Sequence, residues 1–281
     1  MPQKIIDYHS ISTDNTGAET DQLILQIGIS EVACMVKSGL TNLVEEFELY
    51  RLDAGDDNWP DTFFQLRISS DILNRNFKET HCYYQSEEAI LIPQEKFSIS
   101  AAEDYLALVF GESHEHDIKY DTIPAGESMV NAYRLKKIIH AVVGKQFILY
   151  HPHHTYSSMV NGLFTKELPE GFFVKIQCYS KHIIVAVMKE KKLLLIQTFL
   201  YQAPEDILYH VMNLRQQLSF NDTESHLVLC GMLDTETLLL QQLSGPFNST
   251  TIEKIDPHAA KAFTNKDFPL HYFTPFYNLT L

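Results

Sequence analysis

The chain carries one pattern of secondary structure twice, and the two copies begin about 150 residues apart. Residues 23–50 and residues 172–201 each predict three consecutive strands joined by tight turns, because β-branched and aliphatic residues fill both segments. A proline followed by an acid, Pro60-Asp61 and later Pro204-Glu205, then begins a helix in each copy. Proline suits the first helical turn, where no N–H is needed, and the acid favours the positive end of the helix dipole.

The second copy shows the rest of the pattern most clearly. In the helix after Pro204, Ile207, Val211, Leu214 and Leu218 recur at spacings of four, three and four, which places them on one face. The following segments predict a strand, a helix and a strand, at residues 226–232, 235–243 and 251–255. The order β-β-β-α-β-α-β, present twice, predicts an α/β fold of two lobes, each a mixed sheet with helices packed on its faces.

The residues between the two copies have no counterpart in the second copy. They predict a hairpin of residues 77–84 and 89–92 that turns at 85–88. They also predict helices at 99–110 and 135–143 and a strand at 147–151. A polar leader at residues 10–20 predicts loosely ordered chain. We expect an N-terminal lobe with these insertions at residues 1–165 and a C-terminal lobe with an aromatic tail at residues 166–281.

Composition excludes several classes of function. The 281 residues carry a formal net charge of −14 and no stretch rich in lysine or arginine, which opposes binding to nucleic acid. No apolar run approaches the ~18 residues of a membrane span, and the N-terminus lacks the apolar core of a signal peptide. The four cysteines occur singly, without a C-x-x-C pair, at positions 34, 82, 178 and 230. We therefore expect a cytoplasmic protein with reduced, buried thiols.

Several segments carry a resemblance to a known family. They are QIGIS near the start, ILIPQEKF at 90–97, YHVMNLRQQL in the helix after Pro204, the strand LVLCGML, and FPLHYF at 268–273. With them the chain resembles, over nearly its whole length, an uncharacterised bacterial family with an actin-like ATPase fold, a duplicated ribonuclease-H-like fold. It also resembles, more remotely, the actin-like proteins of type IV pilus assembly, which act largely as scaffolds. The resemblance implies a cleft between the lobes in which such proteins often hold a nucleotide.

The first phosphate loop of that superfamily reads Asp-x-Gly-Ser/Thr between the first two strands. The aspartate helps to organise Mg²⁺ and water, while the glycine and the hydroxyl residue let backbone amides approach phosphate oxygens. This chain has Gln26-Ile27-Gly28-Ile29-Ser30. Gly28 and Ser30 are retained, but the neutral Gln26 cannot supply the missing charge.

The other two nucleotide elements are also altered. The second phosphate loop corresponds to Gln177–Lys181, which contains neither aspartate nor glycine and carries Tyr179, a side chain that would crowd a phosphate. The adenosine segment retains one glycine, Gly231. If a nucleotide binds between the lobes, the resemblance implies that Gly28, Ser30, Ser180 and Gly231 line its phosphate or ribose side. A tight strand with no room for a Cβ explains Gly28 equally well.

These losses favour a scaffold or binding protein without catalytic residues and without a cofactor. The alternative is an ATPase or small-molecule kinase that binds Mg-ATP and recruits carboxylates from elsewhere, for which Glu31, Asp206 and Asp234 lie near the relevant strand ends. A serine hydrolase is disfavoured because the chain has no G-x-S-x-G motif. The expected partner is an unknown protein or a second copy of the chain.

Two further clusters bear on binding. His151, His153 and His154 follow a predicted strand, and His151 and His153, at alternate positions of an extended segment, could converge on one metal ion. Pro152 between them and the lack of a nearby carboxylate favour a loop of histidines at a strand end without metal. The C-terminal stretch at 268–277 holds five aromatic residues in ten. We expect this tail to dock on its own sheet, with a contact to a partner as the alternative.

Overall fold

The computed structural model of the protein describes residues 2–9, 20–52, 58–147, 149–220, 224–234, 238–256, 258–259, 263 and 267–281. The predicted polar leader falls outside these residues except for Thr20. The chain divides into two compact units, which are described separately. The first comprises Met1–Met159, Asp256–Asn265 and Leu279–Leu281, and the second comprises Val160–Ile255 and Lys266–Asn278.

The main sheet of the first unit has six strands. In spatial order they are β1 (Gln3–His9), β4 (Val44–Arg51), β3 (Glu31–Lys37), β2 (Gln22–Ile27), β5 (Glu79–Tyr84) and β9 (Tyr150–His154). The pairs β1–β4, β4–β3 and β3–β2 are antiparallel, whereas β2–β5 and β5–β9 are parallel. The expected three-strand meander is confirmed, with one added strand at its edge.

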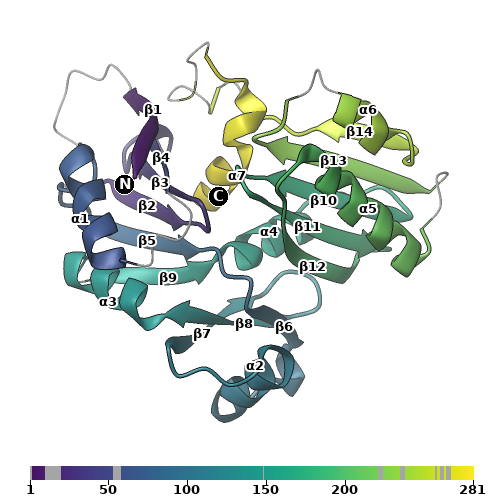
Figure 1. The fold of residues 1–281 in the computed structure, drawn as a ribbon, viewed down its shortest axis with the longest axis horizontal. Helices are drawn as coiled ribbons and strands as arrows, with labels where there is room; N and C mark the ends of the chain where they lie inside the picture. Colours follow the sequence, from purple (N-terminus) through teal and green to yellow (C-terminus); the bar gives the residue numbers. More distant parts are fainter. Residues whose placement is uncertain are drawn as a thin grey trace. The chain divides into compact units, whose positions relative to one another are not determined.

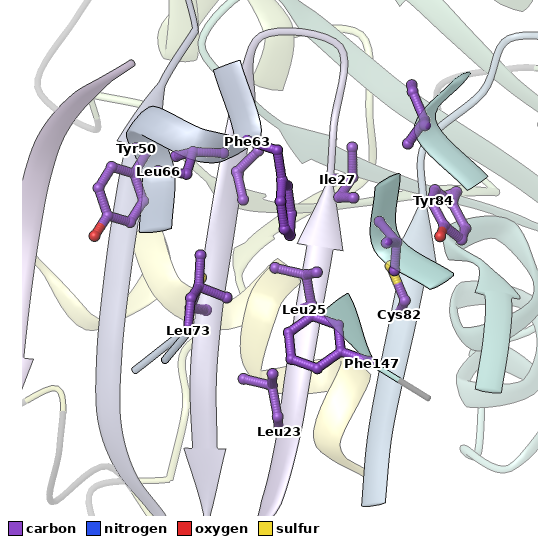
Figure 2. Packing of buried hydrophobic residues seen from close by; sticks show 14 of the residues in the cluster. Leu23, Leu25, Ile27, Tyr50, Phe63, Leu66, Leu73, Cys82, Tyr84 and Phe147 are labelled. Atoms are coloured by element: carbon purple, nitrogen blue, oxygen red, sulfur yellow. The ribbon is translucent and has the colours of Figure 1, made fainter. Parts of the chain in front are cut away.

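Helices α1 (Trp59–Ser69) and α3 (Lys137–Gln146) lie next to each other and cover one face of this sheet (Figure 1). Leu23, Leu25 and Ile27 alternate along β2 toward that face, and Figure 2 shows them in a row with Phe63 and Leu66 of α1 among the packed side chains. Because each such side chain contributes roughly 1.5–3 kcal/mol when fully buried, this cluster is the main source of stability in the unit.

A smaller sheet in the first unit pairs β6 (Ala89–Pro93), β8 (Met129–Lys136) and β7 (His116–Ile123) antiparallel, in that order. Short 3-10 turns (Gln94–Lys96 and Ile99–Ala101) lead to α2 (Ala102–Phe110), which contacts β8. The predicted hairpin of residues 77–84 and 89–92 is therefore wrong. Thr80, Cys82 and Tyr84 are buried within the main sheet, so β5 pairs with β2 and β9, while β6 pairs with β8.

The second unit repeats the meander and its two following strands. Its sheet order is β12 (Lys192–Leu200), β11 (His182–Lys189), β10 (Phe172–Cys178), β13 (Ser225–Gly231) and β14 (Ser249–Ile252). The first two pairs are antiparallel and the last two are parallel, as in β4-β3-β2-β5-β9. Helices α5 (Pro204–Leu218) and α6 (Leu238–Ser244) lie side by side (Figure 1). The predicted duplication is confirmed by this shared strand order.

The aromatic tail docks on its own unit. A 3-10 turn (Leu270–Phe273) and α7 (Thr274–Tyr277) contact β13, and Phe273 and Phe276 are each 1% exposed. A last 3-10 turn spans Asn278–Thr280. Self-docking of the tail is thus confirmed for these two aromatic rings.

Strand β4 differs from the sequence prediction for a local reason. It begins at Val44 and not at Leu40, because the Ser38 hydroxyl accepts the Leu40 and Thr41 amides and Asn42 takes a positive φ of 59°. The edge strand β1, the strands β7 and β8 and the helix α4 (Thr155–Phe164) were not predicted. No helix among the described residues is long and apolar enough to cross a bilayer.

Candidate functional site

The turn between β2 and β3, which corresponds to the first phosphate loop, is closed by its own backbone. The Gly28 amide donates to the Glu31 carbonyl oxygen at 2.8 Å, and the Leu52 amide donates to the Ser30 carbonyl oxygen at 2.8 Å. A phosphate loop uses free amides that point toward the phosphate oxygens. The Gly28 amide is instead committed within the turn.

Gly28 lies close to a side chain and to a backbone carbonyl. An added Cβ would lie 2.4 Å from Gln85 Oε1 and 3.0 Å from the Glu31 carbonyl oxygen. The backbone amide of Gln85 donates to the Ile27 carbonyl oxygen at 3.0 Å, whereas Gln85 Oε1 is the far end of a flexible side chain. A Cβ at position 28 would therefore require the Gln85 side chain to move.

Ser30 and Glu31 form a buried pair at the same turn. The Ser30 hydroxyl donates to Glu31 Oε2 at 2.8 Å, and the two residues are 8% and 1% exposed. The hydroxyl that a phosphate would use is thus bound to a carboxylate. A carboxylate at this place also opposes the approach of a phosphate, since both groups are negatively charged.

Gln26 occupies the position of the superfamily's aspartate. It is fully buried on β2, opposite Ala33 of β3 and Tyr83 of β5. Neither of its amide atoms has a hydrogen-bond partner among the described residues. A neutral amide at this depth cannot organise a metal ion as an aspartate would.

The turn between β10 and β11, which corresponds to the second phosphate loop, is filled by aromatic rings. The Tyr179 amide donates to the His182 carbonyl oxygen at 2.9 Å. The Tyr179 ring stacks on His182 with centroids 4.6 Å apart and meets Phe276 edge-on at 5.8 Å. Ser180 is half-buried at the tip of this turn. Burial lowers the pKa of His182 to about 3, so its ring packs as a neutral group.

Gly231 is required by a close approach of two strands. It adopts a φ of +96°, and an added Cβ would lie 2.1 Å from the Cys178 carbonyl oxygen. The next amide, that of Met232, donates to the same carbonyl oxygen at 2.8 Å. The glycine therefore joins the ends of β10 and β13, which explains its presence without a ribose.

The enzyme alternative requires carboxylates from Glu31, Asp206 or Asp234, and the structure shows what surrounds each of them. Asp206 Oδ2 accepts the Gln202 and Ala203 amides at 2.9 and 3.0 Å, and these bonds lower the pKa of Asp206 while they cap α5. Glu31 is bound to Ser30, as described above. Asp234 is exposed.

A buried carboxylate lies elsewhere in the first unit. Glu48 of β4 is fully buried and accepts hydrogen bonds from Lys4 Nζ at 3.2 Å, Tyr50 Oη at 2.8 Å, the Asp71 amide at 3.0 Å and the Ser70 hydroxyl at 2.5 Å. Four donors satisfy both of its oxygens, as a buried charge requires. This network stabilises the unit.

The same region contains a cluster with metal-ligand composition. One ligand atom from each of Asp7, His9 and Glu48 lies within 4.8 Å of the others. However, Lys4 Nζ bonds both Asp7 Oδ2, at 3.1 Å, and Glu48 Oε1, at 3.2 Å. An ammonium group therefore already supplies the positive charge between these carboxylates.

Of the three histidines singled out in the sequence, His154 is separated from His151 and His153. His154 is fully buried, and its Nδ1 accepts the Tyr156 amide at 3.1 Å. Its Nε2 lies against the backbone of Ser86, 3.2 Å from the amide nitrogen and 3.1 Å from the carbonyl oxygen. Burial lowers the pKa of His154 to about 3. His151 and His153 alternate with it along β9, and the parallel pairing with β5 places His81 beside them. Sequence alone did not indicate His81.

Of the four predicted nucleotide-binding residues, Gly28 and Ser30 share one turn of the first unit, while Ser180 and Gly231 belong to the second unit. Local packing explains Gly231, whereas Gly28 is crowded mainly by the side chain of Gln85. A ligand-binding role for these four residues stays a prediction.

Two solved structures are similar to this chain over most of its length. A protein of unknown function with an actin-like ATPase fold from Bacteroides thetaiotaomicron VPI-5482 is similar with a TM-score of 0.77 and 17% identity, over 89% of this chain and 98% of that one. The PilM–PilN type IV pilus biogenesis complex contains a chain that is similar with a TM-score of 0.56 and 11% identity, over 92% and 97%. At these identities the similarity shows a shared fold, so the actin-like fold is confirmed.

Comparison by sequence gives a family. No curated protein is significantly similar to the chain. A family model described as "Protein of unknown function (DUF3822)" matches residues 11–245, most of the chain. The protein therefore belongs to the DUF3822 family of unknown function.

Proposed function

We propose that this protein is a non-catalytic scaffold or binding protein in which the actin-like fold is kept and the nucleotide site is not. The observation that carries the proposal is that both phosphate-loop turns are closed by their own groups. Gly28 and Tyr179 commit their amides to carbonyl oxygens of the same turns. The Ser30 hydroxyl is bound to Glu31, and the Tyr179 ring is packed on His182.

The ligand of such a protein is another protein or a second copy of the chain. A chain of the PilM–PilN type IV pilus biogenesis complex has a similar fold, which supports a protein-binding role for this fold. The net charge of −14 disfavours nucleic acid as the partner. The four cysteines are buried and free, which suits the reducing cytoplasm that we propose as the location.

The competing function is an ATPase or small-molecule kinase that uses Glu31 in place of the missing aspartate. For this to hold, Glu31 would have to exchange its hydrogen bond from Ser30 for a bound Mg²⁺ with its waters. The carboxylate is 1% exposed, so the turn would have to open for the metal to enter.

Phosphate release from ATP by the purified protein separates the two functions. Wild type, Glu31→Gln and Gln26→Asp are compared with Mg²⁺ present. The proposal predicts no release above the rate in buffer for all three proteins, because Gln26→Asp restores one charge but leaves the turn closed. Release by wild type that Glu31→Gln abolishes would establish the enzyme and refute the scaffold.

A further inference from the structure

Strands β5 and β9 bring three histidines to one face of the first unit's main sheet. The two strands are parallel neighbours (Figure 1), with His81 opposite His151 and Tyr83 opposite His153. Cys82, between His81 and Tyr83, points into the main core. Side chains alternate along a strand, so the histidines lie on the other face.

Two of these rings are placed as if they shared one ion. His81 Nδ1 and His153 Nε2 lie 3.2 Å apart, and the rings are nearly parallel, with an angle of 13° between their planes. Two imidazole nitrogens bound to one tetrahedral zinc ion at about 2.0–2.1 Å are separated by roughly 3.3 Å. The observed spacing therefore matches two ligands of a single tetrahedral ion.

The outer nitrogens of both rings point to carboxylates. His81 Nε2 is 3.5 Å from Glu79 Oε2, and His153 Nδ1 is 4.0 Å from Asp121 Oδ1. Metal-bound histidines in proteins almost always direct the other ring N–H to a carboxylate, a carbonyl or water, which fixes the tautomer. The 3.2 Å separation also suits a hydrogen bond in which one inner nitrogen donates to the other. When the outer nitrogens carry the protons instead, both inner nitrogens present lone pairs that one cation can bind.

The surroundings hold these groups in position. Asp121 Oδ2 accepts the His154 amide at 2.7 Å and the Ser157 hydroxyl at 2.6 Å, so this carboxylate is fixed beside His153. Glu79 Oε2 accepts Gln22 Nε2 at 3.2 Å. The Tyr83 ring stacks on His153 with centroids 5.0 Å apart. A ligand set with supported orientation binds metal better than the same residues on a free loop.

We propose that His81 and His153 bind a divalent transition metal ion, with zinc as the expected ion, through His81 Nδ1 and His153 Nε2. His151 is the nearest further candidate ligand, since it is exposed and stacks on His81 with centroids 5.0 Å apart. Water completes the coordination. Imidazole ligands suit zinc, copper and nickel and disfavour magnesium and calcium.

The test is calorimetric titration of the metal-free protein with Zn²⁺ alone, alongside Co²⁺, whose visible absorption reports tetrahedral coordination. Wild type is expected to bind one equivalent and to show the tetrahedral Co²⁺ spectrum. His81→Ala and His153→Ala are expected to weaken binding at least 100-fold. His151→Ala is expected to weaken it less, and Glu79→Gln to weaken it roughly 10- to 100-fold through the orientation of His81.

The matched control is His9→Ala, which removes a histidine from the Asp7–His9–Glu48 cluster and should leave zinc binding unchanged. Thermal unfolding of each variant without metal verifies that it is folded, and a variant that does not fold is replaced by the corresponding His→Gln substitution. No uptake by wild type, or wild-type affinity in folded His81 and His153 variants, would overturn the proposal. So would loss of binding in His9→Ala alone.

Discussion

Replacement of Gly231 by alanine tests whether this residue is a structural glycine or part of a ligand site. Gly231 has a φ of +96°, and its Cβ would lie 2.1 Å from the Cys178 carbonyl oxygen. A left-handed conformation costs an alanine about 1–2 kcal/mol. The clash is with backbone and cannot be relieved by a rotamer change, so moving the strand ends apart adds about 1–3 kcal/mol. Gly231→Ala should therefore destabilise the protein by roughly 2–5 kcal/mol.

Gly162 provides the matched control. It lies in α4, and an added Cβ there would meet nothing within 4 Å. Because alanine is a better helix former than glycine, Gly162→Ala should stabilise the protein by about 0.5–1 kcal/mol. Urea unfolding followed by circular dichroism measures both changes as shifts of the transition midpoint. A Gly231→Ala protein as stable as wild type would refute the steric explanation and return this glycine to the candidate ligand residues.

Three further predictions concern stability. Glu48→Ala removes the acceptor of four donors, of which the Tyr50 and Ser70 hydroxyls belong to buried residues, and should cost about 3–5 kcal/mol in urea unfolding; wild-type stability would show that the network is dispensable. Phe276→Ala removes a ring packed on Tyr179 and should cost about 3–5 kcal/mol; a change below about 1 kcal/mol would contradict docking of the tail. His154 and His182 have folded pKa values of about 3, well below the usual value near 6.5, so the unfolded state binds more protons between these limits. The free energy of unfolding should therefore fall as the pH is lowered from 6.5 toward 3, by up to about 1.4 kcal/mol per pH unit for each histidine. His154→Phe should make this fall less steep. The same dependence of stability on pH in wild type and variant would count against a neutral buried ring.

The sequence predicted those parts of the fold that depend on local pattern. The strands of both meanders follow from dense runs of β-branched residues such as Ile183–Met188, and α5 follows from its proline and its apolar stripe. The choice of strand partner is not local. Residues 77–84 and 89–92 have the pattern of a hairpin, yet the burial of Cys82 and Tyr84 in the main core assigns them to different sheets.

The candidate sites show the same limit. Gly231 follows a strand in the sequence, but the reason for the glycine is the Cys178 carbonyl oxygen, which belongs to another strand. His81 and His153 are 72 residues apart and meet only through the register of β5 and β9. Gln26 was identified from the sequence because a resemblance supplied the residue expected there. Its burial without a described partner required the structure.

The central claim, that the protein does not bind a nucleotide, is tested most directly by calorimetric titration with Mg-ATP, combined with thermal unfolding in millimolar nucleotide. A ligand at 100 times its dissociation constant would add about 2.7 kcal/mol to the free energy of unfolding, which corresponds to several degrees in melting temperature. The closed turns at Gly28 and Tyr179 predict no heat of binding and an unchanged melting temperature. A saturable heat together with a rise of several degrees would contradict the account and establish Mg-ATP as a ligand.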